Sequence, residues 1–584
     1  MCRSFAFHLK ELDKTKINEQ NSIMKKVVLL AINAKYVHSS LAVWVIAEGI
    51  NKFARKPHDV KIVEATIHHP NDEIIDKIAA HAPDYVGIST YIWNAGKLEE
   101  IIKLLRSRLS DAKLILGGPE AAFNAGYWLK RGADTVLQGE GEYSFPALLN
   151  YYEENSPSNN ATFDGSCHLC HRQGDTNVPY ALCTAHCDGS SLRERRDAVQ
   201  TAPYIDPYTE EYFKTLDGRL AYLETSRGCP FKCAFCLSAG STVQFFPMET
   251  VKEQLNKLSG SGARTIKLVD RTFNCNTTRA YELFEYIINL ETECCFHFEV
   301  AADLFNGHTI NLLKSAPAGR IQFEAGLQSF HEPALQASAR QTSLLKAEQN
   351  IHELLMSKNI HIHVDLIAGL PYETISDFKN SFDRAYSLRA HTLQLGFLKL
   401  LHGSELRKQA AGLKIIYNRQ PPYEIKSSQW LSTQDIQTLK QTENALQHTN
   451  NKGRFLSALE YALVASAMRP SDLFYAIGAS VPNHGKDLSV YAAEIFECLR
   501  KLPGVDEKTL RDHMVYDWLG MVKGKNMPDI LKNADAGRNM VIQTAEKNLG
   551  RKIRRSEVAT LHSGKGIYVD SGDKDPVTGL YKVY

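Results

Sequence analysis

The chain has 584 residues, of which 43% are hydrophobic, 23% charged and 9% aromatic. At about 150 residues per domain this length predicts three to four domains, and the composition excludes both a small disulfide scaffold and a chain disordered throughout. The 68 Lys and Arg residues nearly balance the 66 Asp and Glu residues, so the formal net charge is only +2. A chain-wide attraction to nucleic acid or to an anionic membrane is therefore not expected.

Residues 1–23 form a polar leader without the apolar block of a secretory signal. The longest early apolar stretch, Val27 to Ile32, is far shorter than the roughly 20 residues of a membrane helix. We therefore expect a cytoplasmic protein without a membrane partner. In that compartment the 12 cysteines are expected to be thiols, metal ligands or catalytic groups rather than disulfides.

Residues 24–154 alternate apolar, β-rich runs with amphipathic segments of helix length, a pattern typical of buried parallel strands and their crossover helices. This pattern predicts an α/β domain with a doubly wound, Rossmann-like parallel sheet. The expected strands are residues 26–32, 59–64, 84–89, 113–116 and 135–137.

Small or polar residues follow four of these strands, at the edge where open α/β sheets bind ligands. Small residues there let a flat ligand approach the backbone. The residues concerned are Asn33, Ser89, Thr90, Gly117, Gly118, Gly139, Glu140, Gly141 and Glu142.

Residues 155–203 interrupt the alternation and are expected to be a linker or insertion. Two cysteine pairs in this segment suit either a tetrahedral zinc site or an auxiliary iron–sulfur cluster, although a loop with unligated thiols remains an alternative. The four cysteines are Cys167, Cys170, Cys183 and Cys187.

Residues 204–404 resume the alternation with six strand-and-helix units, which predicts a partial (β/α)6 barrel. The expected strands are residues 220–225, 265–269, 296–300, 320–325, 361–367 and 392–400. Residues 405–584 are expected to form a mainly helical domain, with helices at residues 435–447, 453–468 and 489–502 and a closing loop at residues 571–576.

Directly after the first barrel strand, Cys229, Cys233 and Cys236 form a Cys-x-x-x-Cys-x-x-Cys arrangement. Three thiolates so close together can hold one metal cluster. Because a [4Fe-4S] cluster normally takes four thiolates, three would leave one iron open to a ligand. The triplet, its position after the strand and the segments downstream resemble the radical S-adenosylmethionine (SAM) enzymes.

The resemblance implies that the open iron binds the amino and carboxylate groups of SAM, and that the cluster's electron cleaves SAM to a 5′-deoxyadenosyl radical. By the same resemblance, residues at the strand ends contact SAM. Asp270 and Arg271 also fit a surface salt bridge, and the segment around Glu324 also fits a helix cap. The predicted SAM contacts are Phe235, Asp270, Arg271, Glu324, Gln328, Ile367 and Gly369.

A doubly wound domain before such a barrel resembles the cobalamin-binding subgroup of radical SAM proteins, over about residues 24–404. The segments Gly117 to Glu120 and Gly139 to Glu142 resemble that subgroup's cofactor loops. The Asp-x-His-x-x-Gly motif, whose His ligates cobalt in many cobalamin proteins, is absent. Its nearest counterpart contains Asn33, Tyr36 and His38, although a helix-capping or core role for this His is an alternative.

The resemblance implies methyl transfer to an unactivated carbon of a small-molecule or peptide substrate, with a flavodoxin or ferredoxin as electron donor. Two alternatives remain: a radical SAM reaction without methyl transfer and with a vestigial cobalamin domain, or a zinc-dependent binding or regulatory protein. A tRNA methylthiotransferase is disfavoured, because residues 1–150 contain only Cys2 rather than three cluster cysteines.

Overall fold

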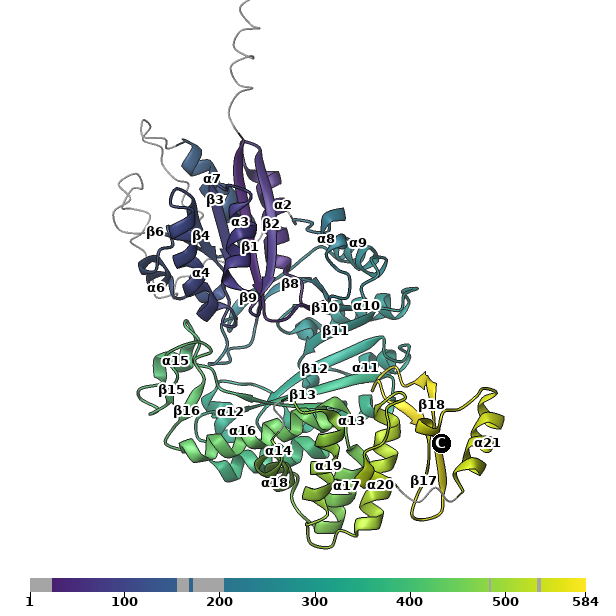
Figure 1. Cartoon of the computed structure of the whole chain (residues 1–584). Coiled ribbons are helices and arrows are strands. Elements are labelled where there is room, and N and C mark those ends of the chain that lie inside the picture. The colour runs from purple at the N-terminus through teal and green to yellow at the C-terminus, as the bar shows by residue number, and fades with distance from the viewer. Residues whose placement is uncertain (1–23, 155–167, 172–203, 483–484, 533–536) are drawn as a thin grey trace, which may run out of the picture. The chain divides into compact units, whose positions relative to one another are not determined.

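The computed structural model describes residues 24–154, 168–171, 204–482, 485–532 and 537–584. The chain divides into two units, Met1–Thr215 and Leu216–Tyr584, and each is described by itself (Figure 1). Three of the four predicted zinc or cluster ligands, Cys167, Cys183 and Cys187, lie outside the described residues. Cys170 falls in a short strand.

The first unit contains a six-stranded sheet in the order β2-β1-β3-β4-β5-β6, in which all pairs are parallel except β5 with β6. Its strands are β1 (Lys25–Asn33), β2 (His58–Thr66), β3 (Tyr85–Ser89), β4 (Lys113–Gly117), β5 (Thr135–Gln138) and β6 (His168–His171). Its helices are α2 (Leu41–Phe53), α3 (Asn71–Ala79), α4 (Ala95–Arg108), α5 (Pro119–Ala122), α6 (Ala125–Lys130), α7 (Gly141–Glu154) and α8 (Glu210–Lys214).

Continuous burial along the central strands shows that both faces of this sheet are covered. Every residue of β1 from Val27 to Asn33 and every residue of β3 is buried. Val28, Leu30 and Ile32 belong to one core with apolar residues of α3, α4 and α6. The prediction of a doubly wound α/β fold is confirmed, because only strands buried on both faces need such uninterrupted apolar runs.

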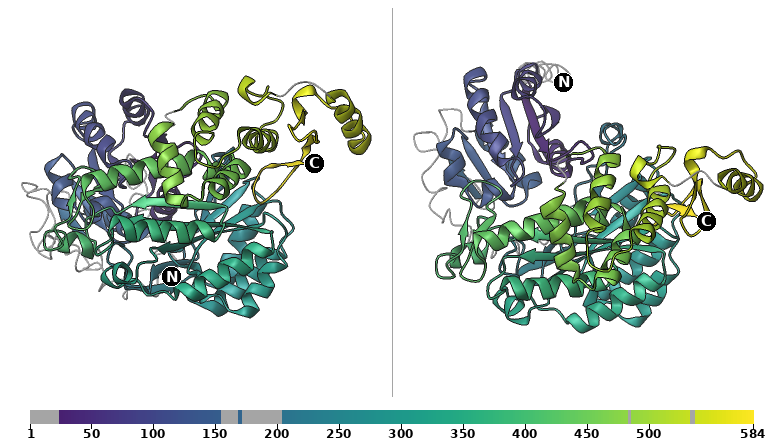
Figure 2. Two further views of the ribbon diagram at one scale, coloured as in Figure 1. Left: turned by 90° about the horizontal axis from the view of Figure 1, so that it is seen from below. Right: turned by 60° about the horizontal axis from the view of Figure 1, so that its bottom comes forward.

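The second unit contains a six-stranded parallel sheet in the order β14-β13-β12-β11-β10-β7, the predicted partial barrel. Its strands are β7 (Ala221–Leu223), β10 (Thr265–Leu268), β11 (Cys295–Val300), β12 (Ile321–Gln328), β13 (Ile360–Ala368) and β14 (Thr392–Phe397). The intervening helices, along one side of the sheet in Figure 2, are α9 (Met248–Ser259), α10 (Thr277–Ile288), α11 (Gly307–Lys314), α12 (Glu332–Ala337), α13 (Leu344–Met356) and α14 (Ile375–Ser387).

Burial in this second sheet alternates, unlike that in the first. Along β12 and β13 buried residues alternate strictly with half-buried ones. The buried face carries an aromatic core that includes Phe298 and Phe323, whose ring centroids lie 5.9 Å apart. The other, inner face is polar and only half-buried, so it is available for ligands.

The residues after the barrel are mainly helical, as predicted. The helices are α15 (Glu405–Gln409), α16 (Thr433–His448), α17 (Leu456–Ser466), α18 (Pro470–Ser480), α19 (Leu488–Leu499), α20 (Glu507–Met521) and α21 (Arg538–Leu549). The strands are β15 (Ile416–Tyr417), β16 (Ile425–Ser427), β17 (Val558–Thr560), β18 (Gly566–Lys574) and β19 (Tyr581–Val583).

The predicted closing loop at residues 571–576 is wrong in its first part. Residues 571–574 continue β18, and Lys574 pairs with Tyr581 of β19. Pairing with a neighbouring strand stabilises this polar segment, whose own sequence has low strand propensity. The finer domain boundaries predicted at residues 154, 203 and 404 stay predictions.

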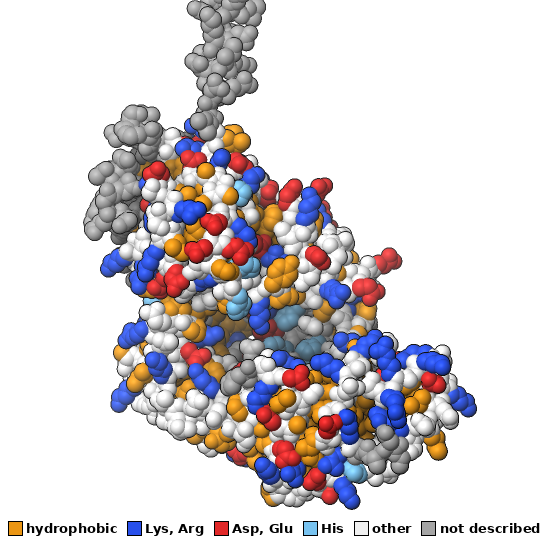
Figure 3. Space-filling view, in the orientation of Figure 1, with side chains coloured by type: hydrophobic (Ala, Val, Ile, Leu, Met, Phe, Trp, Pro, Cys, Tyr) orange, Lys and Arg blue, Asp and Glu red, His pale blue; other side chains and the backbone are white. Residues whose placement is uncertain are grey.

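On the face that Figure 3 shows, acidic and basic side chains are interspersed over the first unit. This distribution agrees with the near-zero net charge. None of the helices in the described ranges combines the length and the apolar composition that a membrane span requires.

Candidate functional site

The cysteine triplet begins at Cys229, the last residue of β8 (Ser226–Cys229), and continues in the loop that leads to the antiparallel strand β9 (Ser241–Phe245). Gly228 has φ +101°, and a Cβ there would lie 2.2 Å from Thr242 O, so only glycine fits. The Cys229 amide donates to Ser241 Oγ at 3.0 Å, and the Cys236 amide donates to Cys233 O at 3.0 Å. The loop is therefore held in shape by its own hydrogen bonds.

All three thiols are free, and Cys229 and Cys233 are buried. Burial raises the pKa of Cys236, and the neighbouring Cys233 and Cys229 raise it further. A backbone hydrogen bond and the charge of Arg271 oppose this rise. Three adjacent thiolates thus require a compensating cationic centre. An iron–sulfur cluster is such a centre, and thiolates are its usual ligands, so this donor set fits one.

Two side chains outside the loop contact these thiols. Arg340 Nη1 lies 3.7 Å from Cys233 Sγ, and Arg340 Nη2 donates to Gly326 O at 2.8 Å. Thr272 Oγ1 lies 3.6 Å from Cys229 Sγ. Arg340 therefore connects the cysteine loop to strand β12.

Cys275, which the sequence analysis did not single out, lies close enough to Cys229 for the two thiols to interact electrostatically. Burial is the main cause that raises the pKa of Cys275, and the nearby Cys229 raises it further. This residue follows β10 at the same strand edge as the triplet. That position is the signal that could have identified it.

Three of the predicted SAM contacts come together beside one apolar cluster. Phe235 and Ile367 both pack against a core that contains Leu398 and Ile425. Gly369 has φ +98°, and a Cβ there would lie 2.9 Å from Ile425 Cδ1. Whether these residues contact SAM stays a prediction, but the apolar surface suits a purine ring.

Gln328 has a buried acceptor without a donor. Its Oε1 has no hydrogen-bond partner within the described chain, and its backbone φ is +71°. A buried unsatisfied acceptor costs about 1–3 kcal/mol, so a donor from a bound ligand fits here. This observation agrees with the predicted SAM contact without testing it.

The Asp270 carboxylate forms hydrogen bonds within the protein. It accepts hydrogen bonds from the Thr225 amide (3.1 Å), Thr225 Oγ1 (2.7 Å) and Ser226 Oγ (2.5 Å). Burial raises its pKa, although these hydrogen bonds oppose the rise. Asp270 thereby ties the end of β10 to the β7–β8 connection, whereas the adjacent Arg271 is exposed.

Glu324 lies on the inner face of the sheet with two basic partners. His297 Nε2 lies 3.0 Å and Lys267 Nζ 3.3 Å from Glu324 Oε2. Burial alone would raise its pKa, but the His297 hydrogen bond and the Lys267 charge lower it to about 2. Glu324 is therefore a permanent carboxylate.

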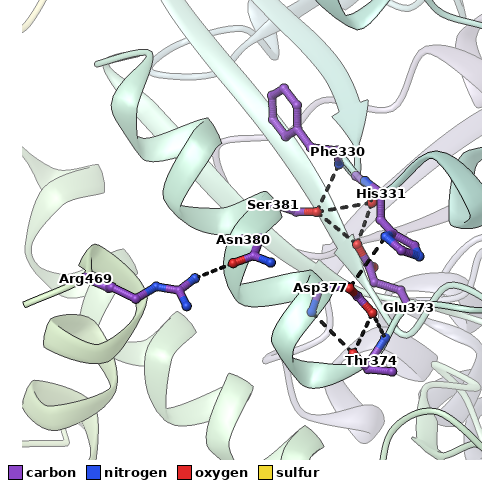
Figure 4. Close-up of polar contacts among 9 residues, drawn as sticks. Phe330, His331, Glu373, Thr374, Asp377, Asn380, Ser381 and Arg469 are labelled. Atoms are coloured by element: carbon purple, nitrogen blue, oxygen red, sulfur yellow. Dashed lines mark hydrogen bonds and ion pairs between the residues drawn. The ribbon is translucent and has the colours of Figure 1, made fainter.

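A fully buried carboxyl, Glu373, supports the loops after β12 and β13 (Figure 4). Ser329 Oγ donates to Glu373 Oε1 at 2.5 Å, and Ser381 Oγ of α14 donates to it at 3.1 Å. Ser381 Oγ also accepts from the Phe330 amide at 3.0 Å. Arg469, which precedes α18, donates to Asn380 of the same α14 at 2.8 Å. The helical region thus contacts the helix that carries this network.

Replacing Glu373 by glutamine is expected to weaken the pH dependence of stability. Burial, opposed by the Ser329 and Ser381 hydrogen bonds, raises the pKa of Glu373 to about 7. This value lies above the ordinary glutamic acid pKa. The contribution of Glu373 to the free energy of unfolding is therefore fully present below about pH 4.5 and is lost as the pH rises through about 7. Glu373→Gln should remove a few kcal/mol of this loss between about pH 4.5 and pH 8.

Thermal unfolding followed by circular dichroism across this pH range measures the effect. Burial also raises the pKa of Asp517 to about 7, so some dependence of stability on pH is expected to remain in Glu373→Gln. The control is Glu353→Gln, since Glu353 is exposed beside Lys314. Identical pH slopes for wild type and Glu373→Gln would contradict the prediction.

In the first unit, the predicted cofactor residues lie at the carboxyl edge of the sheet. Thr90 Oγ1 donates to Gly117 O at 2.6 Å and accepts from the Ala121 amide at 2.9 Å. Gly118 has φ +95°, and a Cβ there would lie 2.6 Å from Thr90 O. The loops after β3 and β4 are therefore hydrogen-bonded to each other and closely packed, and Glu120 is buried beside them.

The β1 loop is fixed by Asn33, whose Nδ2 donates to His38 O at 3.0 Å and to Glu64 Oε2 at 2.9 Å. Tyr36, in the same loop, is 67% exposed. Ser89 Oγ donates to Leu30 O at 3.4 Å. These side chains are held at the edge, but whether they contact a cofactor stays a prediction.

The loop after β5 contains two glycines in different settings. Gly139 has φ +95° with open space around it, whereas a Cβ on Gly141 would lie 2.8 Å from Ile46 Cδ1. Glu142 is buried and Glu140 is half-buried. The loop thus combines close packing against α2 with an open side on which a flat ligand can lie.

An aromatic stack that was not predicted from the sequence lies at this edge. The rings of Tyr91 and Trp93 are stacked with centroids 4.2 Å apart, and Trp93 is 47% exposed. Trp93 Nε1 donates to Ile32 O at 3.2 Å. Two aromatic residues directly after a predicted strand are the signal that could have found this stack.

Three family models match consecutive parts of the chain. They are a B12 binding domain at residues 27–149, the radical SAM superfamily at residues 223–385 and a protein of unknown function (DUF4080) at residues 412–564. The predictions of cobalamin-binding and radical SAM domains are thereby confirmed. These domains imply cobalamin, a [4Fe-4S] cluster and SAM as cofactors.

Among curated proteins, the chain is 24% identical over 338 residues to the cobalamin-dependent radical SAM methyltransferase TokK of Streptomyces tokunonensis, covering 53% of this chain and 46% of TokK. It is 25% identical over 338 residues to the hopanoid C-3 methylase of Methylococcus capsulatus, covering 56% of this chain and 60% of that protein. The chain thus spans about half the length of these relatives.

A solved structure with a similar fold is that of OxsB, a cobalamin-dependent SAM radical enzyme with aqua-cobalamin bound. The TM-score is 0.56 at 12% identity, covering 91% of this chain and 82% of that one. At this identity the comparison establishes the fold.

Proposed function

Since the chain carries a B12 binding domain followed by a domain of the radical SAM superfamily, we propose that it is a cobalamin-dependent methyltransferase that acts on an unactivated carbon of a small molecule or peptide. The observation that carries the proposal is the loop with three free thiols beside the inner face of the barrel. When loaded, the cluster supplies the electron that cleaves SAM, and cobalamin supplies the methyl group.

The chain's own residues position these reactants. Cys229, Cys233 and Cys236 hold the cluster, and Arg340 orients Cys233 relative to β12. The apolar surface with Phe235 and Ile367 receives the adenine. The proposal includes a cytoplasmic location and a one-electron donor such as a flavodoxin or ferredoxin. A zinc or auxiliary cluster at Cys167, Cys170, Cys183 and Cys187 stays a separate prediction.

The test is anaerobic reconstitution with iron, sulfide and cobalamin, followed by counting of iron and cobalt. The loaded protein is then reduced with SAM that carries a deuterated methyl group, in the presence of a metabolite extract of the native host. Formation of 5′-deoxyadenosine together with a deuterium-labelled product is expected. SAM cleavage without label transfer would contradict methylation and favour a radical reaction of another kind.

A further inference from the structure

Strand β12 ends in an irregular turn that holds the Gln328 side chain against the backbone. The pairing of β12 with β13 shifts register between Gly326 and Gln328, and Gln328 has φ +71°, a left-handed value that residues other than glycine rarely adopt. A Cβ on Gly326 would lie 2.2 Å from Gln328 Nε2. The side chain therefore folds back over Gly326, and its Oε1 is the buried acceptor that has no donor among the described residues.

The backbone directly after this turn is fixed by one carboxyl (Figure 4). Ser329 is fully buried. Its Oγ donates to Glu373 Oε1 at 2.5 Å and accepts from the His331 amide at 2.9 Å. Ser381 Oγ donates to the same Glu373 oxygen at 3.1 Å and accepts from the Phe330 amide at 3.0 Å. Through two serines, Glu373 thus determines the path of the chain after the turn.

The beginning of the turn is fixed from the side of the cysteine loop. Arg340 Nη2 donates to Gly326 O at 2.8 Å, and Arg340 Nη1 lies 3.7 Å from Cys233 Sγ. Arg340 and Glu373 therefore hold the two ends of the segment that contains Gln328. The orientation of the Gln328 acceptor depends on both.

Stability does not explain a carboxyl at position 373. Glu373 is fully buried, and its Oε2 has no hydrogen-bond partner within the part of the chain that the structure describes. Burying a carboxyl with an unsatisfied oxygen costs free energy, and an apolar side chain of similar size would avoid this cost. An apolar side chain, however, could not accept hydrogen bonds from the two serine hydroxyls. The carboxyl is therefore suited to fixing the turn rather than to stabilising the core.

We propose that Glu373 is a positioning residue for SAM, because it holds the turn after β12 in the shape that presents Gln328 Oε1 to a hydrogen-bond donor of SAM. The ammonium group, the ribose hydroxyls and the adenine amino group of SAM are such donors, and any of them would satisfy the buried acceptor. Since Glu373 is fully buried, it acts through the turn and not by contact with SAM. This inference rests on the SAM binding that the proposed function requires, and it adds a residue outside the predicted contacts.

The experiment measures equilibrium binding of SAM to the cluster-loaded protein without reductant, so that the readout is independent of turnover. Glu373→Met keeps the length of the side chain but accepts no hydroxyl hydrogen bond. It is expected to weaken SAM binding by about tenfold, and Gln328→Ala by a similar factor. Glu373→Gln retains an oxygen that can accept both hydroxyls, so its SAM affinity should stay within about threefold of wild type.

A double-mutant cycle tests whether Glu373 acts through Gln328. If it does, adding Glu373→Met to Gln328→Ala should change SAM affinity by less than about twofold instead of multiplying the two losses. A role in stability alone would not couple the two positions in SAM affinity. Ser329→Ala removes the hydroxyl that connects the turn to Glu373, and it tests the same route should Glu373→Met fail to fold.

Thr374→Ala is the matched control. Thr374 is the N-cap of α14 and forms a capping box with Asp377, so alanine weakens the same helix without removing a hydrogen bond of Glu373. This variant should bind SAM like wild type. An equal loss in Thr374→Ala, wild-type affinity in both Glu373→Met and Ser329→Ala, or losses that multiply in the cycle would each overturn the inference and leave the proposed function intact. Failure of the cluster-loaded wild-type protein to bind SAM would overturn both.

Discussion

Cys233→Ala is expected to lower reductive cleavage of SAM by at least about 1000-fold, which corresponds to a loss of about 4 kcal/mol in transition-state stabilisation. Cys233 is buried in the centre of the triplet, and its Sγ lies 3.7 Å from Arg340. Alanine at this position leaves one iron of the cluster without a protein ligand. Iron content, the visible absorbance of the cluster and the yield of 5′-deoxyadenosine measure the loss.

Cys275→Ala is the matched control for this experiment. Cys275 is a partly buried thiol. Burial raises its pKa, and the nearby Cys229 raises it further. If three cysteines hold the cluster, this variant keeps its iron and its cleavage activity. Loss of iron in Cys275→Ala would indicate a fourth protein ligand and would remove the open iron that the proposed function requires. Full activity in Cys233→Ala would contradict the cluster assignment itself.

Gly118→Ala is expected to reduce cobalamin binding by the first unit by about tenfold or more. Gly118 adopts φ +95° and ψ 167°, a region open almost only to glycine, and a new Cβ would lie 2.6 Å from Thr90 O. The strain and the clash together cost about 3 kcal/mol and push apart the loops after β3 and β4. Cobalt content after reconstitution and the cobalamin absorbance spectrum report the loss.

Gly126→Ala provides the comparison for Gly118→Ala. Gly126 lies in α6, and a Cβ at this position meets no atom within 4 Å. Alanine there should preserve cobalamin binding and stabilise the helix by up to about 1 kcal/mol. Equal cobalamin binding by the Gly118→Ala, Gly126→Ala and wild-type proteins would show that the Thr90–Gly118 contact has no part in the cofactor site.

The sequence predicts both parallel sheets because their strands are short apolar runs separated by amphipathic segments. The uninterrupted apolar run of β1 also predicts that this strand is covered on both faces. The alternating burial of β12 and β13 was not predicted, although β13 shows the alternation in its letters, His361, His363 and Asp365. Which polar residues share the inner face depends on the register between strands far apart in the chain. The network of Lys267, Glu299 and Glu324 therefore emerges only from the structure.

In the candidate site, too, some features could be predicted from the sequence and others appear only in the structure. The spacing of Cys229, Cys233 and Cys236 is local, so the sequence alone predicts a cluster loop. The contacts of Asp270 with Thr225 and Ser226 join residues more than 40 positions apart and could not be predicted. The position of β18 was likewise missed, because its pairing with β19 outweighs the low strand propensity of its polar end.

By itself, then, the sequence determined the local features of this protein: strand periodicity, glycines at strand ends and the cysteine spacing. Each follows from backbone geometry or ligand reach over a few residues. The tertiary structure alone decided which charges share the inner face, which acceptor lacks a donor and which cysteine lies beside the triplet. These depend on strand order and register, which bring distant residues within interaction distance and exclude the water that would otherwise screen them.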